Sequence, residues 1–247
     1  MPDRGSGCRR DWIAVDGPAG AGKSTLARAL ARALGFRYID TGATYRAAAL
    51  AALRAGLLAQ EPIDADAVVR LVERLDIRIG TDPQADRPAP VYLDGEDVSE
   101  QVRSLEVGQA ASAIARLPGV RHILARLQRR LAEEGPCVME GRDIGTVILP
   151  EACVKLYVTA SLEERARRRA RELAAQATAA EGSTGSDLRV EEVMRELARR
   201  DQQDSSRETA PLMVAPDAVT LDTTGQDLAS VLQRALAICR ERLGGGP

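Results

Sequence analysis

The chain has 247 residues, 45% of them hydrophobic, and its 34 basic and 36 acidic residues leave a formal net charge of −2. This balance excludes an overall electrostatic field that draws the protein to nucleic acid or an anionic membrane, and a single Phe and a single Trp exclude a stacking surface for bases. No apolar run approaches the roughly 20 residues of a membrane span, and the first residues lack the apolar core of a secretory signal. We therefore expect a cytoplasmic protein without nucleic-acid or membrane partners.

Short apolar runs alternate with helical patterns along most of the chain, which is typical of an α/β domain with a parallel sheet. In chain order, strands are expected at 12–16, 36–39, 136–139, 154–158 and 218–221. Helices are expected at 24–34, 45–58, 105–115, 120–131, 162–173, 190–206 and 228–243.

Residues 60–106 interrupt this alternation and indicate a small α+β insert. Its expected elements are a helix at 63–75, strands at 76–79 and 90–93, and a turn at Asp94-Gly95. Further along, residues 177–187 are small and polar, so they are predicted to form a mobile loop.

None of the four cysteines stands in C-x-x-C spacing with another, so neither a zinc site nor a redox pair is predicted. Cys137 and Cys153 lie in apolar segments, and we expect both to be buried, reduced thiols.

The segment DGPAGAGKST follows the first predicted strand and fits G-x-x-x-x-G-K-[ST] from Gly17 to Ser24. Its glycines let successive backbone N–H groups face one concavity, and the start of the next helix adds further donors. Lys23 supplies a compact charge for the outer phosphates, and the Ser24 hydroxyl suits Mg²⁺. A flexible Gly/Ala turn with a surface lysine is the alternative, but it does not account for the strand–loop–helix context. The predicted binding site for ATP with Mg²⁺ comprises Gly17, Pro18, Ala19, Gly20, Ala21, Gly22, Lys23, Ser24 and Thr25.

Arginine stands close to acid at several places after predicted strands, where open α/β sheets bind ligands. Arg46 closes the segment IDTGATYR, and Arg142 stands beside Asp143 in GRDIGT. Guanidiniums bind phosphate in a bidentate way, and carboxylates accept from sugar hydroxyls or a base amino group, so the pattern suits a nucleoside monophosphate as acceptor. A third set is spaced i, i+4, i+7, as on one helical face: Arg200, Asp204 and Arg207.

Most arginines of a chain this rich in them are expected on solvated faces. The run Arg167, Arg168, Arg169 and Arg171 is interpreted mainly in this way. For Asp143, a purely local role remains open, in which its side chain caps the turn after the strand.

The motifs DGPAGAGKST, IDTGATYR, GRDIGT and RDQQDSSRETAPL occur in this order within residues 13–243, and together they resemble the bacterial-type cytidylate kinases. The resemblance implies an α/β P-loop NTPase fold of three layers with a central five-stranded parallel sheet. It also implies a core domain, a monophosphate-binding insert and a helical lid. These would cover residues 11–59, 107–160 and 211–244 for the core, 60–106 for the insert and 161–210 for the lid.

The resemblance further assigns roles to individual residues. Lys23, Arg142 and Arg207 would be catalytic, and Ser112, Arg121 and Asp143 would read the cytosine edge. The full set expected to bind CMP is Thr41, Tyr45, Arg46, Ser112, Arg121, Arg142, Asp143, Arg200, Asp204 and Arg207.

The expected reaction is direct in-line transfer of a phosphoryl group from ATP to CMP or dCMP, in pyrimidine nucleotide metabolism, by a monomer. Such a reaction needs positioning and charge stabilisation rather than a protein nucleophile. Two alternatives stay open. One is a P-loop kinase for another small acceptor such as UMP, AMP or shikimate, and the other is a non-catalytic ATP-binding switch module.

Overall fold

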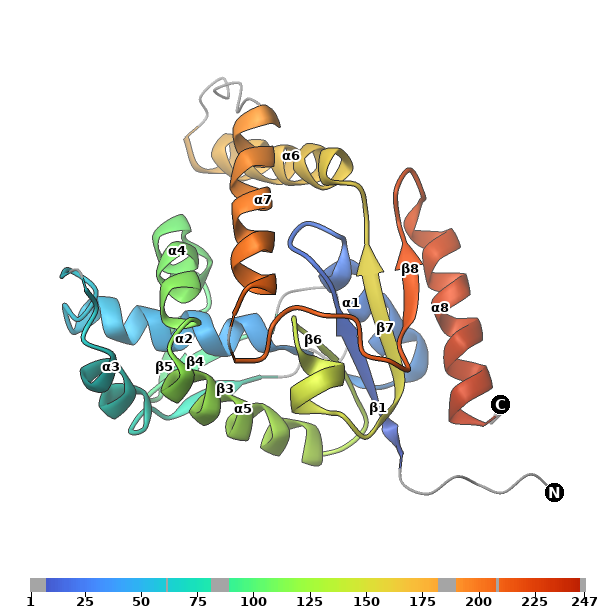
Figure 1. Ribbon diagram of the computed structural model, residues 1–247, viewed down its shortest axis with the longest axis horizontal. Helices are drawn as coiled ribbons and strands as arrows, with labels where there is room; N and C mark the ends of the chain where they lie inside the picture. The colour runs from blue at the N-terminus through green and yellow to red at the C-terminus, as the bar shows by residue number, and fades with distance from the viewer. Residues whose placement is uncertain (1–7, 61, 81–88, 182–189, 208, 245–247) are drawn as a thin grey trace. The chain divides into compact units, whose positions relative to one another are not determined.

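The computed structural model describes residues 8–60, 62–80, 89–181, 190–207 and 209–244 (Figure 1). A five-stranded parallel sheet of order β2-β6-β1-β7-β8 forms its centre, which confirms the predicted fold class. The strands are β1 (Arg9–Asp16), β2 (Arg37–Asp40), β6 (Cys137–Glu140), β7 (Ala152–Thr159) and β8 (Val219–Asp222).

The helices follow the predicted alternation with the strands. They are α1 (Lys23–Leu34), α2 (Thr41–Arg54), α3 (Ala65–Val72), α4 (Leu105–Ile114), α5 (Pro118–Glu133), α6 (Leu162–Glu181), α7 (Val190–Ser205) and α8 (Leu228–Leu243). Two short helical turns complete the set, η1 (Gln101–Arg103) and the π-type turn η2 (Ile144–Ile148). No helix within the described ranges is long and apolar enough to cross a membrane.

The chain divides into two compact units. The first comprises Met1–Arg10, Ala14–Leu26 and Arg142–Pro247, and the second comprises Asp11–Ile13 and Ala27–Gly141. In the first unit, β7 and β8 pair in parallel so that Thr159 lies opposite Asp222. Helices α6 and α7 pack through a small apolar cluster of Ala166, Val193 and Leu197.

The second unit has a core of small and branched apolar side chains. Consecutive alanines of α2, Ala47 to Ala49, are fully buried there, and small side chains allow neighbouring helices to approach closely. The residues predicted as an α+β insert contain α3 and an antiparallel sheet of β3 (Ile77–Ile79), β4 (Val91–Leu93) and β5 (Glu96–Asp97). Positive φ angles of 50° at Asp94 and 87° at Gly95 close the turn that the sequence predicts between β4 and β5.

The bounds of α2 and α6 differ most from expectation. Helix α2 begins at Thr41 rather than 45, directly after β2, because the Thr41 hydroxyl donates to the Glu140 carbonyl (2.7 Å) and holds the first turn on the neighbouring strand. It ends before Gly56, which has a φ of 70°. Helix α6 continues to Glu181, so the first five residues of the predicted mobile loop are helical, and the rest lie outside the described residues.

Cys153 is buried, as expected, but the expectation that it is reduced is wrong, because its sulfur is bonded to that of Cys8. The N–H group of Arg9 donates to the carbonyl of Glu151 (2.6 Å), and this backbone contact brings Cys8 beside β7. Apolar surroundings were the only signal in the sequence, and they carry no information on such a contact. Cys137 is buried and reduced, as expected.

Candidate active site

The glycine-rich loop from Gly17 to Thr25 joins the end of β1 to the first turn of α1. Its glycines Gly17, Gly20 and Gly22 have φ angles of 145°, 74° and 85°, which residues with a side chain rarely adopt. A Cβ atom on Gly17 would lie 2.0 Å from the carbonyl oxygen of Val158, so only glycine fits there. The loop therefore has the backbone conformation that its motif predicts.

Lys23 opens α1 and is only 7% exposed. Its Nζ donates to the carbonyl of Pro18 (2.7 Å), so the ammonium group is folded back over the loop. Ser24 and Thr25 are exposed on the same first turn. An exposed hydroxyl beside a loop of backbone donors fits a cation that is bound together with phosphate groups.

Asp16, which the sequence reasoning did not single out, fixes the segment that follows β6. Its Oδ1 accepts from the N–H of Ile144 (2.8 Å) and its Oδ2 from the N–H of Gly145 (2.7 Å). Burial raises the pKa of this carboxyl group to about 6, although the two backbone hydrogen bonds oppose the change. Asp16 thus ties the strand that precedes the glycine-rich loop to the GRDIGT segment.

Three of the predicted residues, Arg142, Asp204 and Arg207, form a charged cluster with Asp204 at its centre. Asp204 is 8% exposed. Arg142 donates through Nε to its Oδ2 (2.9 Å), and Arg207 donates to its Oδ1. The prediction that Arg207 lies on the helical face of Asp204 is wrong, because α7 ends at Ser205 and Arg207 reaches back from the following segment.

Arg200 is on α7 as predicted, but its ion pair is with Glu196 (2.5 Å) rather than with Asp204. Asp143, 8% exposed, precedes the π-type turn η2, and its side chain makes no capping hydrogen bond to that turn. The alternative that Asp143 is only a cap is therefore not supported.

In the second unit, Thr41 and Arg46 lie on the first turns of α2. Arg46 forms an ion pair with Asp40 (2.7 Å), the last residue of β2. Burial on its own would raise the pKa of Asp40, but the charge and hydrogen bond of Arg46, together with backbone hydrogen bonds at the start of α2, outweigh it and the pKa is lowered. The pair keeps a guanidinium at the carboxyl end of β2.

Tyr45 and Arg121 are brought together in the same unit. The Arg121 guanidinium carbon lies 5.9 Å from the centre of the Tyr45 ring, and the arginine is 5% exposed. Ser112, on α4, directs its hydroxyl to the carbonyl of Gly108 (3.2 Å). Tyr45 and Arg121 are therefore in contact, whereas the Ser112 hydroxyl is bonded within its own helix.

In the arginine run on α6, Arg167 and Arg171 are exposed and Arg169 is partly exposed, but Arg168 has specific partners. Its side chain is 23% exposed, pairs with Glu164 (2.9 Å) and donates to the hydroxyl of Thr223 (2.9 Å). Nearby Arg165, which the sequence reasoning did not consider, is 7% exposed and donates to the carbonyl of Ala19 in the glycine-rich loop.

The chain matches the family model described as cytidylate kinase over residues 13–241. A cytidylate kinase from Caldanaerobacter subterraneus subsp. tengcongensis is 44% identical, and the match covers 94% of this chain and 96% of the relative. Cytidylate kinases from Pelotomaculum thermopropionicum and Mycobacterium avium are each 46% identical over 91% and 93% of this chain, and over 94% and 95% of their own lengths.

Proposed function

Because the chain belongs to the cytidylate kinase family, we propose that it transfers the γ-phosphoryl group of ATP to CMP or dCMP, giving ADP with CDP or dCDP. The observation that carries the proposal is the glycine-rich loop with Lys23, together with the cluster of Arg142, Asp204 and Arg207 in the same unit. The first suits a triphosphate and the second suits a further phosphate group.

On the donor side, backbone N–H groups of the glycine-rich loop and the start of α1 hold the phosphates of ATP. When ATP binds, the ammonium group of Lys23 leaves the Pro18 carbonyl and binds phosphate oxygens. Its compact charge then stays close to the γ-phosphoryl group during the transfer. Mg²⁺ bound with ATP would neutralise phosphate charge, and the exposed hydroxyl of Ser24 would be its protein ligand.

On the acceptor side, Arg142 and Arg207 hold the monophosphate. Asp204 already orients both guanidiniums, so little conformational entropy remains to be lost when the phosphate binds. Arg200 and Asp204 contact the ribose. Catalysis then rests on alignment and on charge stabilisation at the three catalytic residues Lys23, Arg142 and Arg207.

Cytosine is distinguished by its exocyclic amino group. The carboxylate of Asp143 can only accept hydrogen bonds, so it favours this amino group and opposes the carbonyl that uracil carries there. Ser112 and Arg121 complete the reading of the base, and Thr41, Tyr45 and Arg46 hold the acceptor nucleotide. These roles follow from the family resemblance, and each can be tested by substituting the residue.

We further propose that residues 60–106 serve as the monophosphate-binding insert, that 161–210 form a lid over ATP, and that the protein acts as a cytoplasmic monomer. Closure of such a lid excludes water and suppresses hydrolysis of ATP.

A coupled assay of ADP release tests the proposal with CMP, dCMP, UMP, AMP, GMP and shikimate as acceptors. We expect turnover to depend on an acceptor and to be fastest with CMP or dCMP. Faster turnover with any other acceptor would show that this acceptor, and not CMP or dCMP, is the substrate. ATP binding without turnover on any acceptor would favour the non-catalytic switch module.

A further inference from the structure

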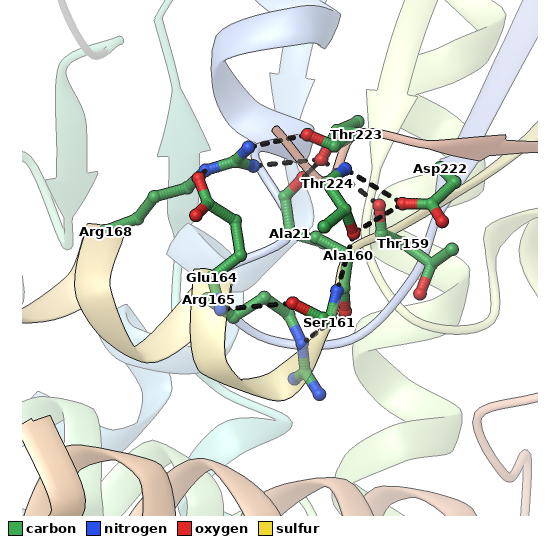
Figure 2. A network of polar contacts seen from close by, with 10 residues as sticks. All are labelled: Ala21, Thr159, Ala160, Ser161, Glu164, Arg165, Arg168, Asp222, Thr223 and Thr224. Carbon is green, nitrogen blue, oxygen red and sulfur yellow. Dashed lines mark hydrogen bonds and ion pairs between the residues drawn. The ribbon is translucent and has the colours of Figure 1, made fainter. Parts of the chain in front are cut away.

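Two side chains outside the glycine-rich loop contact its carbonyl groups. Arg165, on α6, donates through one terminal nitrogen to the carbonyl of Ala19 (3.1 Å). The same nitrogen contacts Asp201 of α7 (2.6 Å), and Nε donates to the carbonyl of Ala160 (3.0 Å). With 8% of its side chain exposed, Arg165 is held at three points, and Figure 2 shows its contact with Ala160.

The second side chain is Thr223, which follows β8 and is 5% exposed. Its hydroxyl lies 3.2 Å from the carbonyl of Ala21 and 3.1 Å from that of Thr159. The hydroxyl is thus within hydrogen-bond distance of both carbonyls, and the Ala21 carbonyl is the one that belongs to the glycine-rich loop. Arg168 holds Thr223 in place by donating to its hydroxyl (2.9 Å) and to its carbonyl (2.7 Å), as Figure 2 shows.

Each contacted carbonyl belongs to a peptide group whose N–H is that of a glycine. In a trans peptide the C=O and N–H bonds point in opposite directions. A contact that fixes the Ala19 carbonyl therefore fixes the direction of the Gly20 N–H, and a contact on the Ala21 carbonyl fixes that of Gly22. Within the described parts of the chain, neither N–H donates to another group, so both are available to a ligand.

These are also the peptide groups that most need a restraint. Gly20 and Gly22 have φ angles of 74° and 85°, and glycine reaches other φ/ψ regions with little steric cost. Rotation of either peptide group would turn a carbonyl oxygen towards the phosphates and replace an attractive donor with a repulsive acceptor.

We propose that Arg165 and Thr223 are positioning residues that keep the N–H groups of Gly20 and Gly22 directed at the phosphates of the donor nucleotide. The inference rests on the proposed function for the identity of the ligand and adds to it the side chains that prepare the loop. It also makes the loop conformation depend on α6, since Arg165 and the support of Thr223 by Arg168 both come from that helix.

Paired substitutions at Thr223 in the full-length protein test the Ala21 contact. Thr223→Val removes the hydroxyl and keeps the shape, whereas Thr223→Ser keeps the hydroxyl. We expect Thr223→Val to weaken the binding of magnesium tripolyphosphate and of ADP by about three- to tenfold in isothermal titration calorimetry, because the N–H of Gly22 is no longer held toward the phosphates. Thr223→Ser should bind both as wild type does, and CMP affinity should stay within about twofold in both variants. Tripolyphosphate binding by folded Thr223→Val that equals wild type would overturn the proposal.

A second pair tests the Ala19 contact and covers the case in which Thr223→Val does not fold. Arg165→Met removes all three contacts, and Asp201→Asn removes the ion pair while Arg165 remains on the carbonyl of Ala19. We expect the first to weaken tripolyphosphate binding and the second to leave it within about twofold, with thermal melting followed by circular dichroism as the check on folding. Equal losses in the two variants would show that packing of α6 on α7 matters and that the carbonyl contact does not.

The outcomes separate this inference from the proposed function. If wild type binds tripolyphosphate but phosphorylates no nucleotide, and Thr223→Val binds it less tightly, the positioning role holds and the proposed reaction fails. If wild type phosphorylates CMP and neither Thr223→Val nor Arg165→Met loses affinity for tripolyphosphate, the positioning role fails and the reaction stands.

Discussion

The glycine-rich loop and the Asp204 cluster, both in the first unit, are held by different kinds of contact. The loop is fixed by backbone conformation and by bonds to its carbonyl groups, from Lys23, Arg165 and Thr223. The cluster is fixed by charge, with one carboxylate shared between Arg142 and Arg207. The glycines that give the loop its conformation lie close together in sequence, whereas the bonds that hold its carbonyl groups, like the ion pair of residues 62 positions apart in the cluster, form only in the folded chain.

The largest effect is expected on the donor side. Lys23→Ala should lower kcat by about a thousandfold or more, because it removes a charge that acts on the moving phosphoryl group, and CMP affinity should change little. Lys155→Met is the matched control, since this other lysine is also buried, with 6% exposed, and pairs with Asp217. Steady-state kinetics with both variants decides the point, and turnover of Lys23→Ala within about tenfold of wild type would contradict the assigned role.

Asp16 precedes the glycine-rich loop and bonds to the segment that follows Arg142 of the cluster. The dependence of the free energy of unfolding on pH tests this contact. The pKa of Asp16 is raised from the ordinary 3.8 to about 6 in the folded protein, mainly by burial. Well below pH 4 the carboxyl group is protonated in both the folded and the unfolded protein. Between about pH 4 and pH 6 it ionises in the unfolded protein but stays largely protonated in the folded protein, so the free energy of unfolding falls as the pH rises. Over this interval the free energy of unfolding of wild type should fall relative to that of Asp16→Asn by about 3 kcal/mol.

Urea denaturation of both proteins between pH 4 and pH 7 measures this difference directly. Only the change of the difference with pH is informative, because Asp16→Asn also loses a hydrogen bond to Ile144 or Gly145 at every pH. A difference that stays constant across the interval would mean that Asp16 ionises with an ordinary pKa.

Asp204 tests whether the cluster orients phosphate-binding arginines or binds the sugar. Asp204→Ala releases Arg142 and Arg207, so KM should rise for both CMP and dCMP by about ten- to hundredfold, the worth of a charge-assisted hydrogen bond. If Asp204 also accepts a hydrogen bond from the 2′-hydroxyl of the ribose, KM should rise further for CMP than for dCMP, which lacks this hydroxyl. Glu192→Gln is the control, because it removes an exposed carboxylate of the same helix and should change KM by less than about twofold. An unchanged KM for dCMP would remove the orienting role.

The sequence was sufficient to predict those features that depend on residues close together in the chain. The fixed spacing of the glycine-rich loop and the alternation of strands and helices predicted the loop and the parallel sheet, because both depend on neighbouring residues. Contacts across long separations were not predictable. Asp16 bonds to Ile144 at a separation of 128 residues, and Thr223 to Ala21 at 202. Arg207 was misplaced on α7 because neither glycine nor proline marks the end of that helix at Ser205.

Asp143 gives the smallest expected effect and the sharpest test of substrate choice. An ionised carboxylate accepts but cannot donate, so it pairs with the amino group of cytosine and leaves a buried, unpaired charge opposite the carbonyl of uracil. Asp143→Asn can donate through its amide, so kcat/KM for CMP should fall by about tenfold while the UMP-to-CMP ratio rises. Steady-state kinetics with the two nucleotides provides its own control, since damage to the neighbouring Arg142 would lower both rates alike. A ratio that stays at the wild-type value would show that Asp143 takes no part in reading the base and serves only the loop between β6 and η2.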